Sequence, residues 1–229
     1  MQVFQGLFSF GQTTQGDRTL SELFQSETKT IHKEVEQHEF VKKILSDSIE
    51  GKDYLQHLVD LHAIYQSLED GLRANLKKTP HIQTIYFEEL CRENGLQRDL
   101  KLLREACNQR PIECSQSAND YVLHLNHLAD STPLLLVAHA YVRYLGDLSG
   151  GMILKQHLEK KWPDAIEFYD FASLLTKHDK KNAWAFKEFF KVKMNQMPLN
   201  DLQRKELAAE AKKAFEFSGK LFDAALHSV

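Results

Sequence analysis

Glycine and proline are scarce in this chain, whose 229 residues include ten glycines and five prolines. Folds made of strands and tight turns need more of both, because these residues supply the backbone conformations of turns. Leu-rich, charged stretches at helical spacing fill most of the length instead. We therefore predict an all-α fold. The length suits one large domain or two small ones, and the lack of repeats and long linkers favours a single domain.

Several other features are absent, and each absence excludes a class of protein. The net charge of −3 gives no reason to expect nucleic-acid binding. Three cysteines are an odd number, which predicts reduced thiols in a cytoplasm rather than a disulfide framework. The longest apolar run, 134–138, is far shorter than the roughly 20 residues of a membrane span. The first residues also lack the basic start of a signal peptide, so we expect a cytoplasmic protein without a membrane anchor.

The most informative stretch is 132–155, which reads TPLLLVAHAYVRYLGDLSGGMILK. A proline at the first helical position, after a threonine as capping residue, predicts a helix that begins near Pro133. At 3.6 residues per turn this helix has an apolar face toward a core and a second face rich in glycine. The apolar face consists of Tyr141, Leu145, Leu148 and Met152, and the second face of Arg143, Gly146, Asp147, Gly150 and Gly151.

Three glycines on one helical face destabilise a helix by roughly 1 kcal/mol each relative to alanine. Two interpretations of that pattern remain open from the spacing alone. Gly146 and Gly150 can form a close contact with another helix. Alternatively, the missing side chains let a flat body approach the backbone beside Asp147. The adjacent glycines at 150 and 151 also favour a kink and some opening of the helix.

Two segments of the chain resemble the motifs of one known family. The run AHAYVRYLGDLSGG at 138–151 resembles the distal-helix signature of heme oxygenases almost residue for residue. The run TKTIHKEVEQHEF at 28–40 resembles their proximal-helix motif, in which a histidine binds the heme iron. The resemblance covers about 20–226 and implies a single helical domain with heme between a proximal and a kinked distal helix. We predict a flexible arm over 1–17 and a catalytic domain over 18–229.

The resemblance implies a role for each matching residue. His32 is the implied iron ligand, and Glu36 is the candidate partner of its other ring nitrogen. Asp147 matches an aspartate that holds a water network for proton supply, and Tyr65 and Arg143 match residues that support this network. The other implied heme contacts are Tyr141, Gly146, Gly150, Gly151, Lys187, Lys191 and Phe215, with Phe222 as a further aromatic neighbour.

The positions expected at the heme propionates depart from the family pattern in two places. Propionate carboxylates need cations at the mouth of the pocket. Lys187 and Lys191 share a helical face, but Lys191 stands where the family has an arginine. Lysine provides charge without the bidentate fork of arginine. Gln25 replaces a lysine that some members carry, so we expect a looser hold on the propionates.

The resemblance implies an enzyme that binds heme as substrate and cofactor and cleaves it with O2 to biliverdin, carbon monoxide and ferrous iron. No G-x-G-x-x-G fingerprint is present, so electrons are expected from an external reductase or ferredoxin. The alternative is a heme-binding protein for storage or sensing, which has no use for Asp147 beside three glycines. A di-iron carboxylate protein is set aside because no glutamate has a histidine three positions later.

Capping and breaking residues predict where the other helices begin and end. Thr19 with Glu22 forms a capping box, the segment 200–203 caps the last helix, and Gly95 is expected to end one. His124 and His127 are capable of binding a metal but are expected on a solvated face, and His139 is assigned no role. The predicted helices cover 19–38, 39–45, 53–75, 83–94, 96–107, 115–129, 180–197 and 200–226, with a short turn or helix at 166–171.

Overall fold

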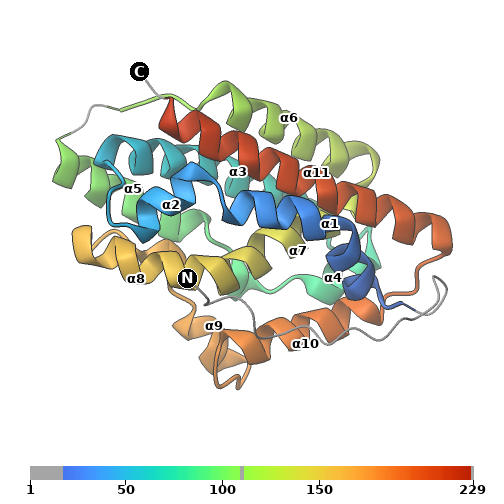
Figure 1. The fold of residues 1–229 in the computed structure, drawn as a ribbon. Coiled ribbons are helices and arrows are strands. Elements are labelled where there is room, and N and C mark those ends of the chain that lie inside the picture. Colours follow the sequence, from blue (N-terminus) through green and yellow to red (C-terminus); the bar gives the residue numbers. More distant parts are fainter. Residues whose placement is uncertain (1–17, 109–110, 228–229) are drawn as a thin grey trace.

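The computed structural model describes residues 18–108 and 111–227, which form eleven α-helices and no strand (Figure 1). The all-α prediction is therefore confirmed, whereas the arm predicted over 1–17 lies outside the described residues. The α-helices are α1 (Leu20–Glu36), α2 (Glu39–Leu45), α3 (Gly51–Asn75), α4 (Pro80–Ile85), α5 (Glu93–Cys107), α6 (Gln116–Ser131), α7 (Leu136–Gly146), α8 (Met152–Lys161), α9 (Ala172–Lys177), α10 (Ala183–Asn195) and α11 (Asp201–Leu226).

Helix α3 lies at the centre of the fold. Its 25 residues pack against α5, α6 and α11, and its large apolar residues are buried. Burial of each such side chain contributes roughly 1.5–3 kcal/mol before conformational entropy is subtracted. This makes α3 a rigid support for the polar side chain of Tyr65, which is also fully buried. The buried apolar residues of α3 include Tyr54, Leu58, Leu61, Ile64, Leu68 and Leu72.

The long helix α11 connects the other helices into a single domain. It runs between α6 and α1 in Figure 1, and it also packs against α3 and α7. The buried alanines at its contacts, Ala208, Ala211 and Ala214, let neighbouring helices approach closely. Since α1 and α7 both pack on α11, this helix fixes their positions relative to each other.

The capping boxes at the two ends of the chain are confirmed. The Thr19 hydroxyl accepts the backbone N–H of Glu22, and the Glu22 side chain accepts the backbone N–H of Thr19. Asn200 and Gln203 make the same reciprocal pair at the start of α11. Caps of this kind stabilise a helix by about 1 kcal/mol. They explain why α1 and α11 begin where the sequence predicts.

The helix predicted over 83–94 is wrong. The chain there forms α4 and a short 3₁₀ turn, Glu88–Leu90, and Gly95 lies inside α5 instead of ending a helix. The buried carboxylate of Glu69 accepts the backbone N–H of Arg92 at 2.5 Å and so caps the start of α5 from another helix. A Cβ at Gly95 would lie 3.4 Å from the backbone of Glu167. This glycine therefore permits a close approach of two segments.

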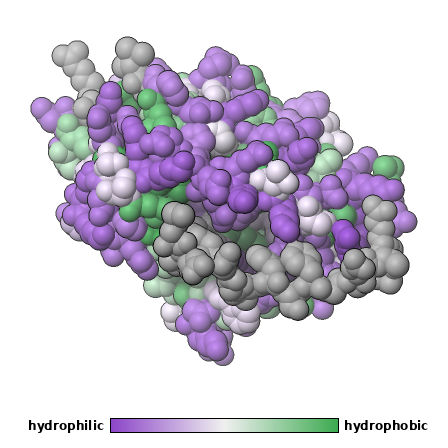
Figure 2. Space-filling view, in the orientation of Figure 1, coloured by the Kyte–Doolittle hydropathy of each residue, from purple (hydrophilic) through white to green (hydrophobic). Residues whose placement is uncertain are grey.

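The surface of the molecule is mostly polar, as Figure 2 shows. On the face drawn there, apolar side chains reach the surface in a hollow that runs between α1 and α2 on one side and α8 on the other. Within the described part of the chain, no helix combines the length and the apolar character needed to cross a membrane.

Candidate active site

The stretch 132–155 folds into two helices joined by a π-helical turn. Asp147–Gly151 forms that turn, between the end of α7 and the start of α8. A π-helical turn inside an α-helix produces a kink and commonly marks a functional site. The cap expected from Thr132 is wrong, because its side chain makes no capping hydrogen bond. The 3₁₀ turn Pro133–Leu135 precedes α7 instead, and the Leu135 N–H donates to the Thr132 carbonyl at 2.9 Å.

The glycines near this turn lie in two different environments. Among the described residues, a Cβ at Gly146 or Gly150 would meet no neighbouring atom within 4 Å. The helix-packing interpretation of these two glycines is therefore wrong, and they form an open, side-chain-free surface. A Cβ at Gly151 would instead lie 3.0 Å from the ring of Tyr169. The expectation that Gly151 shares the open surface is corrected, because Tyr169 fills the space beside it.

A buried polar cluster surrounds Asp147. The Tyr65 hydroxyl on α3 donates a short hydrogen bond to Asp147 Oδ2. The Arg143 guanidinium lies 5.4 Å from the centroid of the Tyr65 ring, and its Nη1 donates to the Ser218 hydroxyl at 3.2 Å. The Nε of Arg143 is buried and has no hydrogen-bond partner within the described chain. Tyr65, Arg143 and Asp147, which were expected to act together, therefore meet from α3, α7 and the π-helical turn. The Nε–H of Arg143 remains an unused hydrogen-bond donor among the described residues of this cluster.

Burial controls the protonation of this cluster. Asp147 is 8% exposed, and its burial raises the carboxyl pKa to about 6, although the charge of Arg143 and the Tyr65 hydrogen bond act to lower it. Burial and the nearby Asp147 charge raise the pKa of Tyr65 well above its ordinary value. Tyr65 therefore remains a hydrogen-bond donor at neutral pH. Asp147 is able to take up or release a proton close to neutrality.

His32 lies on the accessible side of α1. Its side chain is half exposed, and its Nδ1 lies 3.3 Å from Glu36 Oε1, one turn later on the same helix. The imidazole packs edge-on against the ring of Phe215 on α11, with 5.2 Å between the centroids. Because Glu36 engages Nδ1, Nε2 is the nitrogen available to bind a metal.

Helix α11 brings the proximal and distal residues into one region. His32 contacts Phe215, and Arg143 contacts Ser218, three positions further along the same helix. Three residues correspond to about 4.5 Å along a helix axis. At another point, the Phe24 ring on α1 meets the Tyr141 ring on α7 edge-on at 4.9 Å. The helices α1 and α7, which are predicted to enclose heme, are therefore held by their contacts with α11 and with each other.

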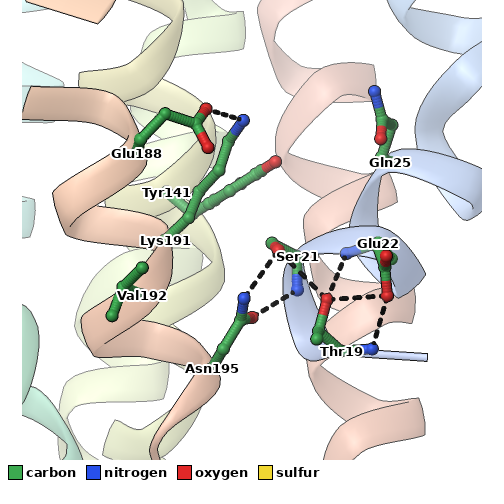
Figure 3. Close-up of a pocket in the computed structure, with 9 residues that line it drawn as sticks. All are labelled: Thr19, Ser21, Glu22, Gln25, Tyr141, Glu188, Lys191, Val192 and Asn195. Atoms are coloured by element: carbon green, nitrogen blue, oxygen red, sulfur yellow. Dashed lines mark hydrogen bonds and ion pairs between the residues drawn. The ribbon is translucent and has the colours of Figure 1, made fainter. Parts of the chain in front are cut away.

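A groove of about 320 Å³ opens between α1 and α10 (Figure 3). Tyr141 extends into the gap, Gln25 lies on the α1 side, and Lys191 lies on the α10 side. Lys191 Nζ is 2.8 Å from Glu188 Oε1, so a carboxylate on the same helix partly neutralises this cation. The groove has the polar lining expected for a propionate end, with one lysine and no arginine among its residues.

The expected pair of lysines is divided between two places. Lys187 does not line the groove but donates a short hydrogen bond to the Ser149 hydroxyl in the π-helical turn. Burial lowers the pKa of Lys187, and the positive charge of Lys191 lowers it further. One cation therefore lies against the distal helix, and the other lies at the groove.

Three residues near the site were missed by sequence reasoning. Ser218 holds Arg143, Tyr169 packs against Gly151, and Glu188 pairs with Lys191. Glu188 had a local signal, because it stands three positions before Lys191 on a predicted helix. The other two come from elements far away in the sequence, and no local pattern identifies them.

Comparison of the sequence with known proteins identifies the heme oxygenase family. The sequence model of the heme oxygenase family matches residues 18–224. Heme oxygenase 2 of Oryctolagus cuniculus is 33% identical over 220 residues, which are 93% of this chain and 68% of that protein. Heme oxygenase of Pyropia yezoensis is 35% identical, over 90% of this chain and 85% of that protein. The chain spans about two thirds of the length of the mammalian relatives that it matches.

The fold agrees with the sequence comparison. The crystal structure of heme oxygenase-1 from the cyanobacterium Synechocystis, in complex with heme, is similar with a TM-score of 0.80 and 32% sequence identity. The similarity covers 90% of this chain and 91% of that one. The family match over residues 18–224 includes both the α1 segment with His32 and the α7–α8 segment with its glycines. The chain therefore belongs to the heme oxygenase family.

Proposed function

We propose that this chain catalyses the oxidative cleavage of heme to biliverdin, with release of carbon monoxide and ferrous iron. The observation that carries the proposal is the side-chain-free surface of Gly146 and Gly150 beside the buried cluster of Tyr65, Arg143 and Asp147. A flat macrocycle fits such a surface, because no Cβ holds it away from the helix backbone. When bound, heme supplies the iron that binds O2, and its ring is the substrate that is oxidised.

His32 would hold the iron through Nε2. Its Nδ1 faces Glu36 at 3.3 Å, and a proton shared there fixes the tautomer and the orientation of the ring. The edge-on contact with Phe215 supports the imidazole from α11. His32 would be the single protein ligand of the iron.

Asp147 would provide protons through water on the glycine side. A carboxyl group with a pKa of about 6 exchanges protons readily near neutral pH. Tyr65 and Arg143 would act as positioning residues, since one donates to the carboxylate and the other supplies a buried positive charge beside it. General acid catalysis of this kind typically contributes about 10²- to 10⁴-fold in rate.

The propionates would extend toward the groove between α1 and α10. Lys191 and Tyr141 line that groove, and Lys187 adds a positive charge beside the π-helical turn. Gly151 would not form part of the open surface for the macrocycle, because the Tyr169 ring occupies the space beside its Cα. With a glutamate beside Lys191 and a glutamine at position 25, we expect a weak electrostatic hold on the propionates.

The reaction also needs O2 and electrons, which neither heme nor the protein supplies. We propose that an external donor, a reductase or a ferredoxin, delivers these electrons. A cytoplasmic location is supported by the state of the cysteines, since Cys91, Cys107 and Cys114 are all free thiols in the structure. Nucleic acid is not expected as a partner at a net charge of −3.

Addition of hemin and a reductant under air tests the proposal. The heme-bound protein should lose its Soret absorption while the spectrum of a bilin appears, and carbon monoxide should be released in an equal amount. A heme-storage or heme-sensing protein is the alternative function. If the Soret band persists through repeated additions of reductant, the chain binds heme without degrading it and the proposal is wrong.

A further inference from the structure

A second cluster of potential metal ligands lies behind the distal helix. His124 on α6 and His139 on α7 both direct Nε2 at Glu210 Oε1 on α11, at 2.5 and 3.0 Å. The three ligand atoms lie within 4.8 Å of one another. The sequence pairs His124 with His127, but the structure pairs it with His139 and Glu210 instead. His127 is exposed and contacts Ser131.

We propose that His124, His139 and Glu210 form a binding site for a divalent transition metal of the zinc class. Two neutral imidazoles and one carboxylate are a ligand set that zinc prefers, with water in the fourth position. Each histidine would bind through Nε2 and carry its proton on Nδ1. Binding involves no oxidation or reduction, because the metal only accepts lone pairs from the ligand atoms.

The neighbouring side chains suit this arrangement. The Tyr121 hydroxyl oxygen lies 2.8 Å from His139 Nδ1, where it is able to accept a hydrogen bond from Nδ1–H and fix the ring. Zinc–nitrogen and zinc–oxygen bonds of about 2.1 Å place tetrahedral ligand atoms about 3.4 Å apart. The contacts at 2.5 and 3.0 Å must therefore open by less than about 1 Å. We expect rotation of the side chains to provide this change.

The exposure of the cluster provides an entry path for a metal. The side chains of His139 and Glu210 are 0% and 4% exposed, whereas that of His124 is 21% exposed. His124 is thus the outermost ligand. Lys213 opposes binding, because its Nζ lies 3.2 Å from Glu210 Oε2 and brings a positive charge next to the metal.

The proposed metal site does not include His32, but it lies on α7 and α11, the helices that also hold Arg143 and Ser218. His139 precedes Arg143 by one turn on α7, and Glu210 precedes Ser218 by two turns on α11. A metal here would link α6, α7 and α11 behind the distal cluster. It should therefore raise the melting temperature of the heme-free protein, since a ligand that binds only the folded state stabilises that state.

Titration of the chelator-treated, heme-free protein with Zn²⁺ tests the proposal by calorimetry. We expect one Zn²⁺ per chain and a higher melting temperature. The variant Tyr121→Phe keeps all three ligands and should weaken binding about 10- to 100-fold, and His124→Gln should weaken it at least as much. Lys213→Gln should strengthen it. Substitution by Co²⁺ should give the intense visible absorption of a tetrahedral site in the wild type and not in His124→Gln.

His127→Gln is the matched control, because His127 lies on the same helix outside the cluster. It should bind Zn²⁺ like the wild type. Circular dichroism must show that each variant is folded, and Glu210→Gln is a second test that preserves the size of the side chain. Absence of Zn²⁺ binding to the wild type would show that the cluster is only a hydrogen-bonded network. Equal binding by the wild type, His124→Gln and Glu210→Gln would place the metal at other histidines, and either result overturns the proposal.

Discussion

Replacement of Asp147 by asparagine should make the heme-free protein more stable at neutral pH. The carboxyl group is buried, and burial raises its pKa from 3.8 to about 6. A difference of about two pKa units corresponds to about 3 kcal/mol in the free energy of unfolding. Asparagine resembles the neutral acid in shape and keeps an oxygen for the Tyr65 hydroxyl. It therefore removes the penalty for burying a charge with little change in packing.

The sign of the pH dependence follows from this raised pKa. Well below about pH 4, Asp147 is neutral in both the folded and the unfolded chain, so its ionisation does not affect the difference between the two proteins. As the pH rises from about 4 to about 6, the unfolded chain loses the proton first. The folded wild type then binds more protons and loses stability relative to the variant. The full difference of about 3 kcal/mol should be present above about pH 7.

Urea denaturation of both proteins across this pH range measures the effect. Other buried carboxyl groups with raised pKa values, such as Glu69 and Asp99, are common to both proteins and cancel in the comparison. Asp130→Asn, which removes a carboxyl group at an exposed position, is the matched control. If the difference between wild type and Asp147→Asn does not change with pH, Asp147 does not carry the penalty that the structure indicates.

Three further predictions concern the other parts of the site. His32→Ala should lose most of its heme affinity and regain a heme spectrum with added imidazole, and an unchanged ferric spectrum without imidazole would contradict its role. Gly146→Ala should stabilise the heme-free protein by up to about 1 kcal/mol and weaken heme binding. Gly151→Ala should destabilise the heme-free protein in urea denaturation. Equal effects of the two substitutions would show that the two glycines do not lie in different environments. Glu188→Gln should strengthen heme binding and Lys191→Ala should weaken it, each by about 1 kcal/mol or less. If hemin titration shows no change in the heme affinity of either variant, the propionates do not bind in this groove.

Local signals predict several helix ends in this chain correctly. The capping boxes at Thr19 and Asn200 need only residues three positions apart, and both are present in the structure. Asn182 also caps α10 through its side chain, although the sequence predicts a start at 180. Such contacts are within one turn of helix, so the sequence contains all the information that they require.

The features that the sequence does not predict depend on distant partners. Helix α5 begins at Glu93 because Glu69 on α3 caps it, and no pattern near residue 93 shows this. Gly151 and Gly146 are equivalent in spacing, but Tyr169 packs against only one of them. Helical periodicity gives the face on which a residue lies, and the fold decides what covers that face.

The same limit applies to charged and titratable residues. Lys187 and Lys191 are one turn apart and suggest a single cation pair, but Ser149 binds one and Glu188 the other. His124 and His127 suggest a pair on α6, but His124 contacts Glu210 on α11, whereas His127 contacts Ser131 on α6 itself. Contacts between helices therefore determine which of the candidate groups work together.

Single turnover of bound heme by the wild type and Asp147→Ala tests the central claim most directly. The claim is that Asp147, beside the open surface of Gly146 and Gly150, supplies the protons for heme cleavage. Both proteins should bind one hemin through His32 with similar affinity and similar ferric spectra. After addition of reductant under air, the wild type should produce biliverdin, and Asp147→Ala should produce it at least about 100-fold more slowly. Biliverdin formation by Asp147→Ala at the wild-type rate would contradict the claim.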